Sequence, residues 1–134
     1  MKKQRIQSPS VREPAPQLWS NCMVVGGVAY VSGMTARGPD GQTVIGDDEY
    51  QQSKVIFQKI QDLVRAAGGA MDDVVKMTIF VTRIAHNTKV WEARKEFFSG
   101  DFPACTLVEV SSLAKPEILV EIEATAHIGC SADA

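Results

Sequence analysis

Hydrophobic and polar residues alternate most regularly close to the C-terminal end of the chain, over residues 119–128. The even positions there are all apolar, whereas the odd positions after Leu119 are Glu, Glu, Thr and His. A period of two residues predicts a β-strand that buries one face and leaves the other open. Residues 105–110 alternate less cleanly, with Thr106, Val108 and Val110 on one face and Cys105, Leu107 and Glu109 on the other. We therefore expect two neighbouring strands in this part of the chain.

The segment between these two runs, residues 111–116, is short. A short connection predicts an antiparallel pair with Cys105 opposite Glu121, because opposite residues share a face with Cα atoms about 5.5 Å apart. The thiol and the carboxylate are therefore expected together on the face that the core does not use. Glu109 and Glu123 are expected on the same face. This concentration of carboxylates indicates a cleft, and a solvated outer surface is the alternative.

Turn and helix signals divide the preceding part of the chain. The Gly26-Gly27 pair between two β-rich runs is typical of a tight hairpin. Apolar residues at helical spacing follow Asp47 and Asp48, either of which can cap a helix, whereas polar residues such as Lys59 take the solvent side. The elements expected before the two C-terminal strands are an edge strand at 4–7, strands at 23–25 and 28–32, a helix over 48–67, a strand over 74–82, and a helix from 87 or 88 to 99–100.

Both predicted helices carry one apolar stripe, and both stripes need the same sheet face to bury them. The sequence therefore predicts an α+β two-layer sandwich, a mixed β-sheet with two helices on one face. The open sheet face has mixed polarity, which favours a partly polar subunit interface. With 134 residues, 45% of them hydrophobic, the chain is expected to form a single domain over residues 1–134, in which residues 1–16 are an extended N-terminal segment.

Charge and cysteine content narrow the function classes. Fourteen Lys and Arg against sixteen Asp and Glu give a net charge of -2, so the basic surface of a nucleic-acid-binding protein is not expected. Cys22, Cys105 and Cys130 have no paired spacing, and no apolar run has membrane length, which favours a reducing cytoplasm and no membrane partner. His86 and His127 lie in different predicted elements. We expect no metal and no cofactor.

Several short motifs occur in order between about Trp19 and Ile128. They are Val31-Ser32-Gly33, Ala66-Ala67-Gly68 followed by residues 73–81, Phe97-Phe98, Phe102-Pro103-Ala104, and residues 120–124. Together they resemble the reactive intermediate deaminases, the RidA family, also called YjgF or the endoribonuclease L-PSP domain. No single motif is specific, but the series in the right order is.

The resemblance implies a chorismate-mutase-like fold and a homotrimer, whose sheets form a central barrel with three small-molecule clefts between subunits. Family members hydrolyse reactive enamines and imines, such as 2-aminoacrylate and its imine tautomer, releasing ammonia and a 2-keto acid. In that mechanism an Arg directly after the Pro-Ala pair clamps the substrate carboxylate through a bidentate contact. The Glu that matches Glu121 positions the attacking water.

This chain departs from the family pattern where the substrate carboxylate binds, because Cys105 stands in place of the Arg. Of the family residues, Gly33 and Glu121 carry over. Thiols need cationic neighbours to ionise near neutral pH, so Cys105 is expected to pack or to contact a ligand rather than to act as a nucleophile. The resemblance places Glu121 in the catalytic role and gives as substrate-binding residues Gly33, Cys105, Trp19, Trp91, Thr106 and Leu107.

One of these assignments has an alternative, and one further residue is a candidate. Trp19 and Trp91 each offer a large face for stacking a planar ligand. Trp91 also stands at core spacing with Phe98, which favours packing over binding. Arg37, in the loop after Gly33, is a candidate for the missing cation, although a lone loop Arg is more often solvated.

Two functions from different classes are consistent with the sequence. One is a divergent hydrolase or deaminase acting on an enamine, imine or related small metabolite, with Glu121 as general base for water. The other is a catalytically silent trimer that binds small molecules in its clefts. Ribonuclease activity, suggested by the older domain name, gains no support from the acidic composition.

Overall fold

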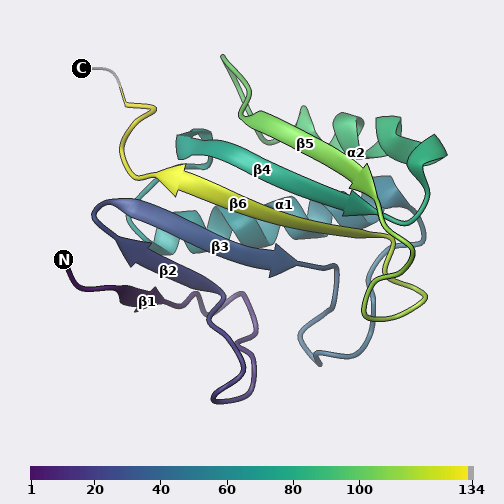
Figure 1. The fold of residues 1–134 in the computed structure, drawn as a ribbon, viewed down its shortest axis with the longest axis horizontal. Coiled ribbons are helices and arrows are strands. Elements are labelled where there is room, and N and C mark those ends of the chain that lie inside the picture. Colours follow the sequence, from purple (N-terminus) through teal and green to yellow (C-terminus); the bar gives the residue numbers. More distant parts are fainter. Residues whose placement is uncertain (133–134) are drawn as a thin grey trace.

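A computed structural model describes residues 1–132 as a twisted six-stranded sheet that two helices cover on one face (Figure 1). The strand order is β1-β2-β3-β6-β4-β5, with every neighbouring pair antiparallel except the parallel pair β4 and β5. The predicted α+β sandwich with a mixed sheet is confirmed. The single domain was expected to end at residue 134, and residues 133–134 lie outside the described part. The elements are β1 (Gln4–Ile6), β2 (Cys22–Val25), β3 (Val28–Met34), α1 (Glu49–Ala66), η1 (Met71–Asp73), β4 (Val74–Val81), η2 (Ile84–His86), α2 (Asn87–Arg94), β5 (Ala104–Glu109) and β6 (Val120–His127).

Helix α1 forms the centre of the helical layer. The Asp48 side chain accepts a hydrogen bond from the Gln51 backbone N–H at 2.8 Å, which confirms Asp48 as the N-cap. Gly68, with φ 93°, turns the chain away after the last helical turn. No helix within residues 1–132 has the length and apolar character that a membrane crossing requires. The predicted apolar stripe packs against β3 and β6 through Ile56, Phe57, Ile60, Leu63 and Val64, all fully buried.

The β2–β3 hairpin forms as predicted. Gly26 and Gly27 have φ values of 57° and 77°, the left-handed pair that a two-residue type I′ turn requires. The short strand β1 adds to the outer edge of β2, where an edge strand was expected. The N-terminal strand β1 therefore forms one edge of the sheet.

The predicted antiparallel pairing of the two C-terminal strands is wrong, because β4 lies between them. Strand β5 runs parallel to β4, with Cys105 beside Met77, whereas β6 runs antiparallel to β4, with Glu121 beside Phe80. The connecting residues 110–119 need to span only about two strand spacings, roughly 10 Å, which ten residues do easily. The position between β5 and β6 also gives β4 hydrogen-bonding partners on both edges.

This register also corrects the expected faces. Paired residues share a face, and Met77 is buried under the helices, so Cys105, Leu107 and Glu109 lie on the helix side of the sheet. The β6 residues that face the core are Val120, Ile122, Ala124 and Ala126, as the alternation predicted, so Glu121 lies on the open side. The thiol and the carboxylate are therefore on opposite faces.

Helix α2 is shorter than predicted, because it ends at Arg94 rather than near residue 100. Phe98 follows the helix in a turn and packs edge-on against Phe57, with ring centroids 6.0 Å apart. Trp91 stays 43% exposed, so its predicted packing with Phe98 in the core is wrong. Residues seven apart share a helix face only where the helix continues between them.

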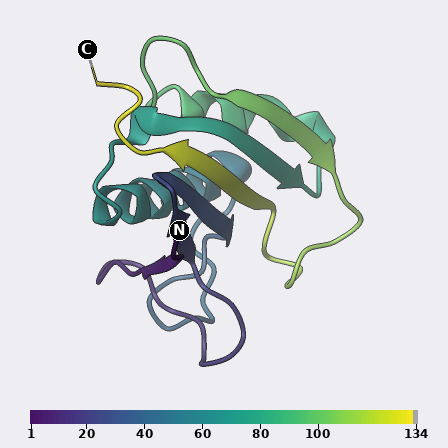
Figure 2. The ribbon, with the colours of Figure 1, turned by 60° about the vertical axis from the view of Figure 1, so that its left-hand side comes forward.

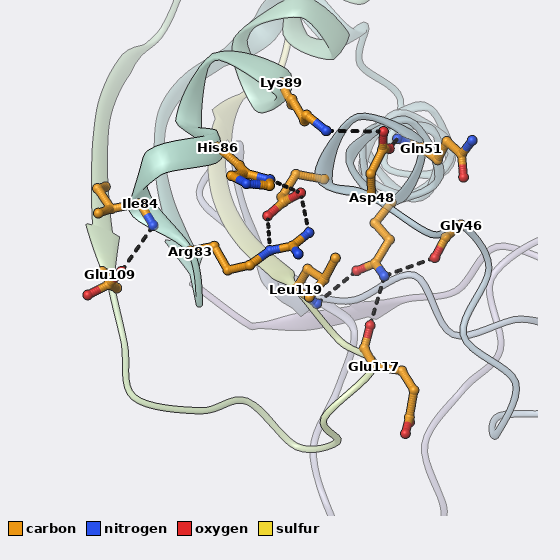
Figure 3. Close-up of polar contacts among 12 residues, drawn as sticks. Gly46, Asp48, Gln51, Arg83, Ile84, His86, Lys89, Glu109, Glu117 and Leu119 are labelled. Atoms are coloured by element: carbon orange, nitrogen blue, oxygen red, sulfur yellow. Dashed lines mark hydrogen bonds and ion pairs between the residues drawn. The ribbon is translucent and has the colours of Figure 1, made fainter.

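A polar network joins the start of α1 to the segment that follows β4 (Figure 3). Glu49 is fully buried, and its two carboxylate oxygens accept hydrogen bonds from Arg83 Nε and Nη2, both at 2.9 Å. His86 Nδ1 lies 3.2 Å from the same carboxylate. Burial raises the pKa of Glu49, but the hydrogen bonds and charge of Arg83, the backbone N–H of Glu49 and the contact with His86 together outweigh burial and hold that pKa below its ordinary value.

Candidate functional site

Glu121 and Gly33 form the best-defined polar feature of the open sheet face. The pairing of β3 with β6 shifts between Val31 and Met34, and this irregularity sets Gly33 against Glu121. A Cβ added at Gly33 would lie 2.6 Å from Glu121 Oε2 and 2.9 Å from its carboxyl carbon, closer than side chains approach. Glycine at position 33 therefore permits the carboxyl group to lie directly over the backbone of β3.

The surroundings of Glu121 make its carboxylate a stronger base than usual. Partial burial raises the pKa of Glu121, the negative charge of Glu123 raises it further, and the charge of Arg37 opposes both. A carboxylate with a raised pKa accepts a proton from water more readily while it remains ionised. Both sequence-derived residues of the family pattern, Gly33 and Glu121, are thus in direct contact.

A cavity of about 400 Å³, which we call the tryptophan cavity, is lined by Gly33, and Glu121 reaches it only through its contact with Gly33. Trp19 stands at its rim, 52% exposed, and Gly33 and Arg37 also line it. Ser32 holds the segment that carries Trp19, because its Oγ donates to the Ser20 carbonyl at 2.6 Å. The volume lies in the usual range for small-molecule sites, and Trp19 supplies a flat apolar wall.

The remaining predicted site residues lie elsewhere. Strand β5, which carries Cys105, Thr106 and Leu107, forms the sheet edge farthest from β1, and β4 separates it from β6. Thr106 is on the open face and accepts a hydrogen bond from Lys76 Nζ at 3.0 Å. Leu107 packs against the core, and Cys105 is exposed on the helix side.

Trp91 belongs to this second group, because α2 lies in the helical layer behind β5 (Figure 1). The predicted site is therefore split within one chain: Trp19, Gly33 and Glu121 come together, whereas Cys105, Thr106, Leu107 and Trp91 lie toward the other edge. One chain does not bring the two groups into a single cleft.

Sequence reasoning placed Lys59 on the solvent side of its helix, and this placement is wrong. The Lys59 ammonium donates hydrogen bonds to the carbonyl oxygens of Thr35 and Arg37, both at 2.7 Å. Burial and the nearby charge of Arg37 lower the pKa of Lys59 to about 8. The helical pattern marked Lys59 only as polar, and it carried no signal that residues 35–37 would cover that side of α1.

Arg37 is also less solvated than a lone loop Arg was expected to be. Its Nε is shielded from solvent and has no hydrogen-bond partner within residues 1–132. Cys22 is buried, which raises the pKa of its thiol to about 11 and makes it unreactive. Within the same described part, no group of three or more His, Cys, Asp or Glu side chains is arranged to hold a metal ion.

Comparisons with known proteins cover nearly the whole chain. Residues 11–128 match the family described as endoribonuclease L-PSP. A protein of unknown function from Pseudomonas aeruginosa is 38% identical, with a TM-score of 0.85 over 96% of this chain and 94% of that chain. YyfA, a protein of unknown function of the conserved Rid family from Yersinia pestis, is 31% identical, with a TM-score of 0.86 over 95% and 100%. RidA from the Antarctic bacterium Psychrobacter is 29% identical, with a TM-score of 0.84 over 93% and 99%.

Proposed function

Because the chain belongs to the endoribonuclease L-PSP family, which includes the Rid proteins, we propose that it hydrolyses an enamine, imine or related small metabolite, with Glu121 activating the attacking water. The observation that carries this proposal is the contact between Glu121 and Gly33 beside the tryptophan cavity. It supplies a base of raised pKa next to a hollow of small-molecule size.

The chemistry assigned to Glu121 is general base catalysis. The carboxylate takes a proton from water while the water oxygen bonds to the imine carbon, giving a carbinolamine. The protonated Glu121 returns this proton to the nitrogen. Glu121 then takes the proton of the carbinolamine hydroxyl and passes it to the nitrogen, and ammonia leaves as the carbon–oxygen double bond forms. The sum is one imine and one water converted to one carbonyl compound and one ammonia. An enamine first takes up a proton at carbon to become the imine.

The split of the predicted site supports a homotrimer as the working assembly. A cleft that contains Glu121 together with Cys105 needs two chains, because the two residues lie on opposite faces of the sheet within one chain. A head-to-tail contact of this kind closes into a ring when the rotation permits, and three chains then give three equivalent clefts. The open sheet face fits such a contact, because it holds a hollow of about 310 Å³ lined by both apolar and polar residues, among them Tyr30, Thr78 and Glu123.

The proposed substrate is neutral, or is anchored by a cation other than the family Arg. Cys105 brings no positive charge, and Glu121 and Glu123 repel an anionic substrate. We therefore expect negligible acceleration of 2-iminopropanoate decay when a serine dehydratase generates the imine in a coupled assay. Cys105→Arg is expected to restore part of this activity. Fast decay with the unchanged chain would contradict the expectation and would point to Arg37, which lines the tryptophan cavity.

The decisive test is ammonia release from a panel of imines and enamines. Glu121→Gln is expected to lower the rate by at least about a hundredfold, as removal of a general base does. Glu123→Gln is the matched control, because it removes the same charge two residues along the same strand face. Binding of panel compounds without ammonia release would support the alternative, a silent small-molecule-binding trimer, which the loss of the family Arg favours. Equal rates for both variants would remove Glu121 from the mechanism.

A further inference from the structure

A second and larger cavity, of about 690 Å³, lies on the helical side of the molecule. We call it the helix cavity. Residues 37–45 and the N-terminal segment form its other walls, and these two segments run side by side (Figure 2), joined where Arg12 Nη1 donates to the Pro39 carbonyl at 3.0 Å. One side of α1 forms its floor, through residues at helical spacing, Lys54, Val55, Gln58, Lys59 and Asp62.

The helix cavity has an excess of positive charge. Arg12, Arg37 and Lys59 line it, and none of the three has a carboxylate within 4.0 Å among residues 1–132. Lys54 is compensated by Glu96, which lies 3.5 Å away. The one lining carboxylate, Asp62, accepts hydrogen bonds from Ser10 and Gln58, so its oxygens are already engaged.

Two of these cations have lost much of their hydration without gaining a counterion. The Arg37 Nε is shielded and unpartnered, and the Lys59 ammonium is held by carbonyl oxygens alone. Partly desolvated like charges raise the free energy of the folded chain, and a bound anion removes that cost. Apolar side chains from the same two walls, Ile45 and Val55, line the cavity together with these cations.

We propose that the helix cavity binds an amphipathic anion: a small molecule whose carboxylate or phosphate group contacts Arg37, Arg12 and Lys59, and whose apolar body packs on Ile45 and Val55. A volume of about 690 Å³ suits a small organic molecule rather than a bare ion. Guanidinium groups favour both head groups through bidentate contacts. Arg12, Arg37 and Lys59 also line the tryptophan cavity, so Ile45 and Val55 are the residues that distinguish this site from it. The proposal does not require the proposed hydrolysis.

Anilinonaphthalene sulfonate, a fluorescent aromatic anion, is the probe for this site on the full chain. We expect saturable binding with one site per chain. Phenylnaphthylamine has the same aromatic body without the acid group. Its affinity is expected to be lower by a factor of at least about ten. Equal affinity of the charged and neutral probes, or the absence of saturable binding, would overturn the proposal.

Variants place the probe in the helix cavity rather than the tryptophan cavity. Ile45→Glu adds a carboxylate to a side chain that is 44% exposed and lines the helix cavity but not the tryptophan cavity, so it tests the location and is expected to weaken binding by roughly tenfold or more. Arg37→Gln removes a cation that lines both cavities, so it tests the contact with the acid group, and the same loss is expected. Lys95→Gln, which removes one charge from the end of α2, and Trp19→Ala are expected to leave binding within about twofold. Circular dichroism checks that each variant is folded. Unchanged binding in folded Ile45→Glu would place the probe elsewhere and refute the site.

Two further measurements separate this proposal from the proposed function and identify the head group. Ile45→Glu is expected to keep its ammonia release, and Glu121→Gln is expected to keep its probe binding. The two proposals can therefore be refuted independently of each other. Octanoate or octyl phosphate, competing with the probe, is expected to displace it, and whichever binds more tightly identifies the head group. Displacement by octanol with equal strength would show that the apolar side chains alone bind, against the proposal.

Discussion

Gly33 is important because it has no side chain. The carboxyl group of Glu121 occupies the space where any other residue would place its Cβ, 2.6 Å from Oε2. That position shields the carboxylate and raises its pKa. The ionised carboxylate of Glu121 is therefore held in surroundings that disfavour its negative charge, which is a common cost at functional sites.

The raised pKa of Glu121 predicts that Glu121→Gln stabilises the fold. The folded chain binds this proton more tightly than the unfolded chain, so the wild-type stability falls as pH rises through the unfolded and then the folded pKa. The midpoint of urea unfolding of Glu121→Gln should therefore exceed that of the wild type at neutral pH, and the difference should shrink in acid below about pH 4. A lower midpoint at neutral pH would mean that Glu121 is stabilising and not strained.

Several residues of the site could be identified from the sequence and several could not. Glu121 was found because strand alternation and a family motif both pointed to it, and its contact with Gly33 then follows from two adjacent strands. Lys59 and Arg12 could not be found, because a cation beside a cavity and a cation in water have the same local pattern. Only the path of residues 35–45 across α1 distinguishes them.

At the scale of elements, alternation specified which residues of a strand share a face but not which strand lies beside it. The faces of β6 were predicted correctly, but β5 was assigned the wrong face, because the prediction paired it directly with β6 and β4 lies between the two strands. A period of two residues predicts a strand, but it is the same whether the next strand pairs with it directly in a hairpin or lies beyond an intervening strand. The end of α2 was missed for a related reason, because apolar residues continue at helical spacing through Phe97 and Phe98 after the helix has ended.

The network at the start of α1 predicts a large stability cost for a single substitution. Glu49→Gln removes a buried, bidentate, charge-assisted contact with Arg83 and should lower the free energy of unfolding by about 1.5–3 kcal/mol. Because the pKa of Glu49 is lowered on folding, this contribution is present above its ordinary pKa and is lost as pH falls through the folded value. Urea unfolding at neutral and acidic pH measures both.

Glu96→Gln is the matched control for that experiment. Glu96 bonds to Tyr50 and pairs with Lys54 on the exposed side of the helices, so its loss should barely shift the unfolding midpoint. Equal effects of the two substitutions would show that the Glu49 network is no more important than a surface pair.

At the scale of the whole molecule, the proposed cleft requires more than one chain. Glu121 lies on the open face of the interior strand β6, whereas Cys105 lies on the helix side of the edge strand β5. A trimer of three chains of 14.6 kDa is expected to have a mass near 44 kDa by light scattering. A mass near that of one chain would leave the two groups apart.

The measurement closest to the central claim is ammonia release by mixed oligomers, using the substrate that the wild type hydrolyses fastest. Glu121→Gln lacks the base, and Cys105→Trp fills the cleft from the β5 edge, so each chain alone should be inactive. In a ring with clefts shared between neighbours, random mixing in equal amounts pairs an intact base with an intact edge in about one quarter of the clefts. Recovery of about that fraction of the wild-type rate is the predicted result. No recovery from well-mixed, trimeric protein would contradict a cleft built from two chains.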